Sequence, residues 1–119
     1  MARYTRQPEQ AIASYQEAIA ILRKIGDRPS EGTALSNSGM ALFETGRAEE
    51  AETVLLDAIA TWESLRSGLS DSDQISLFET QADTYQALQR VQIYLKRFNQ
   101  VLETSERGRA RAFLEIVAR

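Results

Sequence analysis

The sequence repeats itself at an interval of 40 residues. Pro8 to Ala11 aligns with Ala48 to Ala51, and the stretch from Tyr15 to Ile19 aligns with the stretch from Leu55 to Ile59. Self-similarity at such an interval is typical of a solenoid of helical hairpins, in which each hairpin buries its apolar face against its neighbours. The alanines that recur within the repeat let a facing helix approach closely, because a larger side chain there would overpack the contact.

Apolar residues recur at steps of three and four along the chain, which is the spacing of one helix face. Gly26 and Asp27 provide a helix stop and an N-cap, and Thr45–Arg47 forms a short turn. Ser70 and Asp73 have the spacing of a capping box. A further break is expected near residues 94–97, although no glycine or proline marks it, because a helix from 73 to 119 would be roughly 70 Å long. The expected map is a helix at 8–25, a hairpin at 28–66 and a longer hairpin at 72–119.

These residues resemble the tetratricopeptide repeat family. The first helix of each hairpin in that family carries a small residue between two large ones, and the second helix carries two small residues seven apart. The first pattern fits Leu35, Gly39 and Leu42, and again Phe78, Ala82 and Tyr85. The second fits Ala51, Leu55 and Ala58, and more loosely Val101, Ser105 and Gly108. The resemblance implies an all-α, right-handed superhelical stack of antiparallel helical hairpins. It would be a single domain over residues 1–119 with about 2.5 repeats, opening on an orphan second helix.

Two stretches resemble a narrower group. Ile25–Arg28 and Glu106–Phe113 look like the repeats found upstream of CHAT domains, which are caspase-like, in cyanobacterial multidomain proteins. The chain has no histidine and no cysteine, so it lacks the residues of such a peptidase. The resemblance therefore implies the repeat part of a larger protein, with a neighbouring effector domain as one partner.

The amino-acid composition argues against several classes of function. Without histidine or cysteine the common nucleophile–base pairs are missing, so the chain is not expected to be an enzyme or to hold a catalytic, cofactor-binding or metal site. The net charge of −3 gives no electrostatic reason to bind nucleic acid or an anionic membrane. Arg107, Arg109 and Arg111 are explained by the negative end of the last helix and by a solvated helix face better than by a nucleic acid. No signal peptide or membrane-spanning segment is evident, so a cytoplasmic location is expected.

The resemblance also implies a peptide-binding groove, because first helices line the concave surface in this family. Asn37 stands where the family often has an asparagine that hydrogen-bonds a bound peptide backbone, although a solvated polar residue would look the same in the sequence. The groove residues that the resemblance implies include acidic residues and no basic one, so the groove is expected to prefer neutral or basic peptide segments over acidic ones. The expected groove residues are Thr33, Ser36, Asn37, Met40, Phe43, Glu44, Ser76, Glu79, Thr80, Asp83, Gln86 and Ala87.

The expected function is protein–protein interaction or scaffolding, with self-association as the alternative. Neither end of the stack has an obvious polar cap, since Tyr4 and Tyr15 lie near one end and Phe113, Ile116 and Val117 near the other. An uncovered apolar end would favour a homodimer. Trp62 is interpreted as a core residue, with a contact surface as the alternative.

Overall fold

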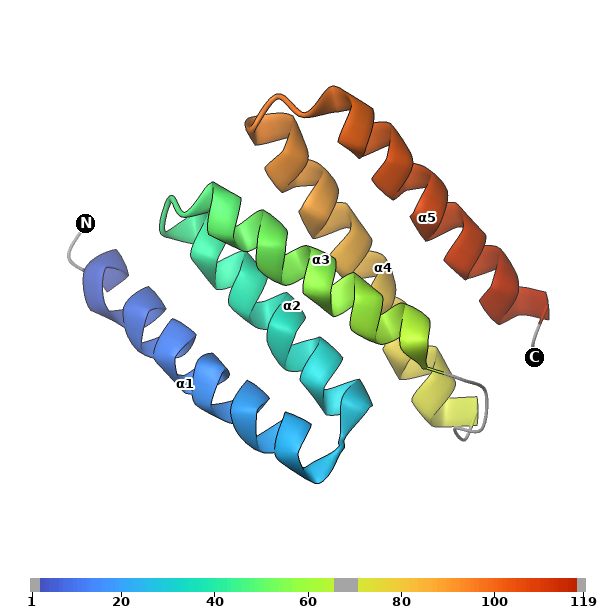
Figure 1. Cartoon of the computed structure of the whole chain (residues 1–119), viewed down its shortest axis with the longest axis horizontal. Helices are drawn as coiled ribbons and strands as arrows, with labels where there is room; N and C mark the ends of the chain where they lie inside the picture. The colour runs from blue at the N-terminus through green and yellow to red at the C-terminus, as the bar shows by residue number, and fades with distance from the viewer. Residues whose placement is uncertain (1–2, 66–70, 118–119) are drawn as a thin grey trace.

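The described part of the chain forms five helices (Figure 1). The computed structural model describes residues 3–65 and 71–117, apart from the side chains of residues 3–8, 71–79, 115 and 116. No strand occurs within these ranges. The helices are α1 (Arg3–Ile25), α2 (Arg28–Glu44), α3 (Ala48–Ser64), α4 (Asp71–Tyr94) and α5 (Phe98–Val117). The all-α stack predicted from the repeat is therefore confirmed.

The helices pack in two layers. One layer holds α1, α3 and α5, here called the outer layer, and the other holds α2 and α4, the inner layer. In Figure 1, α3 crosses in front of α2 and α4. The shortest dimension of the molecule, 21 Å, matches two helices of about 10 Å each. Successive helices in the chain alternate between the layers, as the hairpin repeat requires.

Three of the connections are the same turn. In each, a residue two or three positions after the helix donates its backbone N–H to a carbonyl five residues earlier: Asp27 to Leu22, Arg47 to Leu42 and Arg97 to Gln92, at 2.8–3.0 Å. This is the bond of a Schellman motif, and it needs a left-handed residue just before the donor. The left-handed residues are Gly26, Gly46 and Lys96, with φ of 79°, 85° and 61°. The expected break near 94–97 is confirmed, and it lacks a glycine because Lys96 takes that conformation.

The start of α2 agrees with the prediction from the sequence, whereas the start of α1 differs from it. Asp27 caps α2 by accepting a hydrogen bond from the Ser30 backbone N–H at 3.3 Å, and Pro29 occupies the first turn. The start expected at Pro8 is wrong, since α1 begins at Arg3. Pro8 lies in the second turn, where its missing N–H removes one backbone bond without ending the helix. Ser70, of the capping box expected before α4, lies outside the described residues.

The core lies between the layers and is centred on α3. Leu55, Ala58, Ile59 and Trp62 are fully buried, so the interpretation of Trp62 as a core residue is confirmed. In the main cluster, Leu55 and Ile59 pack with Leu88 and Val91 of α4, Leu42 of α2 and Ile12 of α1, among other residues. Because α3 contacts both inner helices, it buries more of its surface than the helices at the edges.

Ion pairs join successive helices of the outer layer at one end. Arg23 of α1 binds Asp57 of α3 at 2.8 Å, and Glu63 of α3 binds Arg107 of α5 at 2.8 Å. Arg23 and Glu63 are 40 residues apart, the repeat interval of the first two outer helices. The two pairs therefore occupy equivalent positions with their charges exchanged.

A second set of ion pairs joins the opposite ends of the same helices. Arg47, just before α3, binds Glu9 of α1 at 3.0 Å. Arg97, just before α5, binds Glu52 of α3. Each neighbouring pair of outer helices is thus held at both ends, and we call these four ion pairs the outer ladder. Because most of their side chains are partly exposed, each pair contributes modest stability and mainly fixes helix register.

Candidate functional site

The expected groove residues divide into exposed and buried sets. Asn37 and Glu44 of α2 and Asp83 and Gln86 of α4 are exposed, and Thr33 and Thr80 are half-buried. Met40 is half-buried against the core. The side chains of Ser76 and Glu79 lie outside the described residues. The exposed residues belong to the two inner helices, where the groove was expected.

Ser36 was expected in the groove, and that prediction is wrong. Its side chain is fully buried and lies 2.7 Å from the Thr84 hydroxyl of α4. The Thr84 hydroxyl donates to the Thr80 carbonyl at 2.8 Å and accepts from Trp62 Nε1 at 3.3 Å. Ser36 therefore donates to Thr84, because that hydroxyl has one proton, already used. Position 36 faces α4 across the core, and its polar group is satisfied there.

Two further expected residues also turn toward the packing between α2 and α4. Ala87 is buried, not exposed, and packs in the main core. Phe43 is half-buried and meets Tyr94 edge to face, with ring centroids 5.6 Å apart and an interplanar angle of 80°. Tyr94 itself is exposed, so this aromatic pair lies at the surface where the two inner helices meet.

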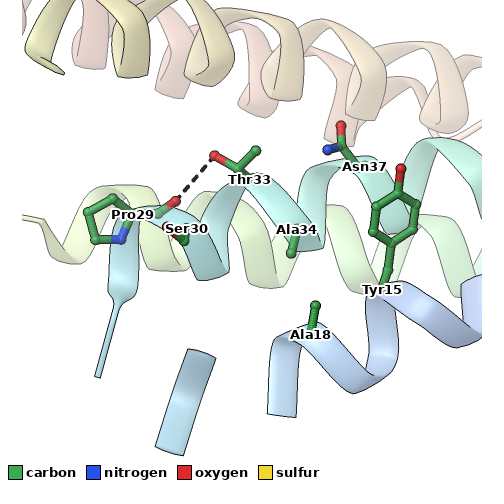
Figure 2. A pocket seen from close by; sticks show the side chains of 7 residues that line it. All are labelled: Tyr15, Ala18, Pro29, Ser30, Thr33, Ala34 and Asn37. Atoms are coloured by element: carbon green, nitrogen blue, oxygen red, sulfur yellow. Dashed lines mark hydrogen bonds between the residues drawn. The ribbon is translucent and has the colours of Figure 1, made fainter. Parts of the chain in front are cut away.

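A pocket of about 340 Å³ lies between α1 and α2. Figure 2 shows the Tyr15 ring rising from α1 beside Asn37 of α2, and the Ala18 and Ala34 side chains between the two helices. The Thr33 hydroxyl donates to the Pro29 carbonyl at 3.2 Å and keeps its lone pairs for another donor. None of the lining residues carries a charge at neutral pH. They are Tyr15, Ala18, Pro29, Ser30, Thr33, Ala34 and Asn37.

Sequence reasoning placed Thr33 and Asn37 in the groove and missed the other five lining residues. Tyr15 and Ala18 were interpreted as apolar positions of α1, and the repeat offers a signal that separates them from core. Their equivalents in α3, Leu55 and Ala58, are fully buried, whereas Tyr15 and Ala18 are half-buried. A tyrosine in place of leucine brings a hydroxyl that prefers a polar partner or solvent.

Arg90 of α4 was also absent from the predicted groove residues. It is exposed on α4, four residues after Gln86 and seven after Asp83, and helical spacing puts the three on one side of the helix. The inner layer therefore presents a mixture of charges.

One cluster of titratable groups links α3, α4 and α5. Arg107 donates to both oxygens of Glu63, at 2.8 and 3.2 Å, and the Tyr85 hydroxyl donates to Glu63 Oε2 at 3.0 Å. Burial raises the pKa of Glu63, but the hydrogen bonds from Arg107 and Tyr85 and the charges of Arg107 and Arg111 outweigh it, so the pKa lies below its ordinary value. Burial, followed by the Glu63 charge, raises the pKa of Tyr85. Arg111 also donates to Gln81 of α4 at 2.9 Å, so Arg107 and Arg111 attach α5 to the neighbouring helices.

Acid is expected to weaken this attachment. Because the pKa of Glu63 is lower in the folded chain than in the unfolded chain, ionised Glu63 stabilises the fold above the unfolded-state pKa of about 4.3. That contribution is lost as the pH falls through the lower, folded-state pKa. Urea unfolding of the wild type and of Glu63→Gln at pH 7 and about pH 3 should therefore show a smaller pH dependence in the variant. Glu50→Gln, at an exposed position of α3, is the control. An equal pH dependence in wild type and Glu63→Gln would contradict the prediction.

The described part of the chain offers no cluster of three or more acidic residues that could hold a metal ion. Nor does any helix within it have the length and apolar character needed to cross a membrane. Two features of the described residues could take a ligand: the uncharged pocket between α1 and α2 and the polar face of the inner layer.

Comparison with known proteins agrees with this geometry. The model of the tetratricopeptide repeat family matches residues 1–64. Tetratricopeptide repeat protein 28 of Mus musculus is 38% identical over 95 residues, and its Homo sapiens counterpart is 38% identical over 94 residues. These alignments cover 78% and 77% of the chain but 4% of each relative, so the chain spans a small part of their length. No solved structure matches the chain significantly. The chain belongs to the tetratricopeptide repeat family, whose helical hairpins are protein–protein interaction and scaffolding modules.

Proposed function

We propose that the chain binds an extended, neutral or basic segment of another protein along α2, with one uncharged side chain of that segment in the pocket between α1 and α2. The observation that carries this proposal is the uncharged lining of the pocket, with Ala18 and Ala34 between the helices and Asn37 and Thr33 among its polar groups. An apolar cavity with a few convergent polar groups is the usual form of a ligand site. Catalysis forms no part of the proposal.

Asn37 is the residue proposed to form hydrogen bonds with the backbone of the bound peptide. It is exposed, and its amide both donates and accepts, as a peptide group in an extended chain requires. The Tyr15 hydroxyl lines the same pocket and offers a second polar contact.

Charges outside the pocket set a further preference. Glu44 and Asp83 are exposed on the inner layer together with Arg90, whereas Arg28 of α2 pairs with Glu31 and donates to Ser64 of α3, so neutral or basic segments are favoured over acidic ones. This preference should weaken as salt rises, because exposed charges are screened.

The test begins with short peptides selected from a random display library on the wild-type protein. Asn37→Ala is expected to weaken their binding about fivefold in calorimetry, since a neutral hydrogen bond contributes about 1 kcal/mol. The free energy of unfolding should change by less than about 0.5 kcal/mol, as for other exposed substitutions. Glu50→Ala, on α3 of the outer layer, should leave binding unchanged. Selected peptides that bind Asn37→Ala as tightly as the wild type, or a preference for acidic peptides, would reject this site.

The family resemblance supports one further proposal, that the repeats serve a neighbouring effector domain of a CHAT type. It rests on the stretches Ile25–Arg28 and Glu106–Phe113. The sequence of the parent gene tests it, since a downstream domain with a histidine–cysteine pair is expected. A parent gene without such a domain would contradict it.

A further inference from the structure

The face of α5 that points away from α4 carries large apolar side chains that are exposed in the described part of the chain. Figure 1 shows α5 at the edge of the stack, with α4 on one side of it. Phe98, Leu102, Phe113 and Val117 are each at least 60% exposed, an unusual density of large apolar side chains at a surface. Glu106 and Arg109 lie between them and are also exposed. We call these six residues the α5 stripe. At 100° per residue they fall within a sector of about 100° on the helix surface.

This face does not continue the outer ladder. Equivalent residues of α3 and α5 are 50 positions apart, so Phe113 is the equivalent of Glu63. At this position α1 and α3 carry the charged residues Arg23 and Glu63, which bind the next outer helix, whereas α5 carries an apolar residue. Leu102 likewise stands 50 residues after Glu52, which binds Arg97. A further repeat stacked in the same register would meet apolar residues where the ladder has ions. The stripe is therefore suited to a different, apolar partner.

The order of residues in the stripe identifies that partner. The steps between successive members are four, four, three, four and four, so the stripe reads the same in both directions. The types of residue are complementary when the order is reversed: apolar residues meet apolar residues, and the acid meets the base. A helix laid antiparallel on a copy of itself would place Phe98 against Val117 and Leu102 against Phe113. Glu106 of each copy would then face Arg109 of the other.

We propose that two copies of this chain pair through α5, antiparallel about a two-fold axis at the middle of the stripe. Such an isologous contact buries the same patch on both copies, as closed dimers generally do. Within one chain Arg109 lies 3.6 Å from Glu106, an exposed pair on adjacent turns. In the dimer each of these charges gains an opposite partner across the axis, at the centre of two apolar contacts. The peptide pocket between α1 and α2 plays no part in the contact.

Charge reversal tests the pairing itself. Wild type at tens of micromolar should sediment at about twice the monomer mass of 13.4 kDa. Glu106→Arg and Arg109→Glu each place like charges opposite one another and should weaken the dimer at least about tenfold. An equimolar mixture of the two variants restores both opposite-charge contacts and should form a heterodimer. The double variant Glu106→Arg/Arg109→Glu should form a homodimer again.

Two apolar substitutions complete the experiment. Phe113→Ser should also weaken the dimer at least about tenfold, because it removes the contact with Leu102 from both halves. Ile21→Ser, at an equally exposed apolar position on α1, is the matched control and should leave the dimer intact. Circular dichroism verifies that each variant is folded. A wild-type chain that stays monomeric, a dimer that survives either single charge reversal, or a mixture that stays monomeric would each overturn the proposal. Loss of the dimer in Ile21→Ser would do so too.

Discussion

Replacing Trp62 with alanine is expected to lower the free energy of unfolding by about 4 kcal/mol. The indole is fully buried at the centre of the two layers. A Cβ placed on Gly32 of α2 would lie 3.0 Å from the ring, so the ring packs directly against the α2 backbone. Its Nε1–H reaches the Thr84 hydroxyl of α4 at 3.3 Å. One side chain of α3 thus holds both inner helices, and its loss leaves a cavity that the packed helices fill only in part.

Urea unfolding followed by far-UV circular dichroism measures this effect. Fluorescence is unsuitable, because Trp62 is the single tryptophan of the chain. Trp62→Phe separates the ring from the hydrogen bond, and it should cost about 1–2 kcal/mol for the lost bond and the smaller ring. Ile93→Ala, at an exposed position of α4, should change stability by less than about 0.5 kcal/mol. A loss below about 1 kcal/mol for Trp62→Ala would show that the indole does not fill the core.

The repeat predicts the fold well because the ends of α1, α2 and α4 share one local cause, a left-handed residue in the turn that follows. Gly26 and Gly46 mark their turns, since a left-handed residue is most easily a glycine. Lys96 occupies the same position in the third turn at a cost of about 1 kcal/mol, which surrounding contacts such as the ion pair of Arg97 with Glu52 offset. Helix length alone therefore predicted a break near residues 94–97, but the sequence did not show that Lys96 forms it.

The site was harder to predict because one residue along a helix turns the side chain by 100°. Asn37 is exposed beside the pocket, whereas Ser36 is buried against Thr84. Both are small polar residues, and the sequence gives no sign that a serine and a threonine 48 positions apart satisfy each other inside the core. The pocket raises the same difficulty, because it exists only where Tyr15 and Ala18 of α1 meet α2.

Tertiary packing likewise decided the role of the basic residues in α5. The sequence favoured a general interaction of Arg107, Arg109 and Arg111 with the end of the helix. Arg107 instead makes a two-bond contact with Glu63 of α3, and Arg111 contacts Gln81 of α4. Arg109 alone of the three has its contacts within α5, to Ser105 and Glu106. This difference leaves Arg109 on the exposed stripe.

Replacing Gly39 with leucine is expected to lower the free energy of unfolding by about 3 kcal/mol. A Cβ at this position would lie 2.6 Å from Leu55 Cγ and 2.7 Å from Leu55 Cδ2, well inside normal contact distance. Leu55 is fully buried in the main core, so it has no free space to move into. The helices α2 and α3 would have to separate. Asn37→Leu adds the same side chain to an exposed position of α2 and should change stability by less than about 0.5 kcal/mol.

A double-mutant cycle distinguishes this steric clash from a general effect of leucine at position 39. Leu55→Ala alone should cost about 3 kcal/mol through the cavity that it leaves. In Gly39→Leu/Leu55→Ala the new leucine can occupy that cavity, because the two positions face each other across the α2–α3 contact. The double variant should therefore be more stable than the sum of the single effects predicts, by about 1–3 kcal/mol. Strict additivity in urea unfolding would show that Gly39 and Leu55 do not share one packing site, and that the register of the α2–α3 hairpin differs from the one described.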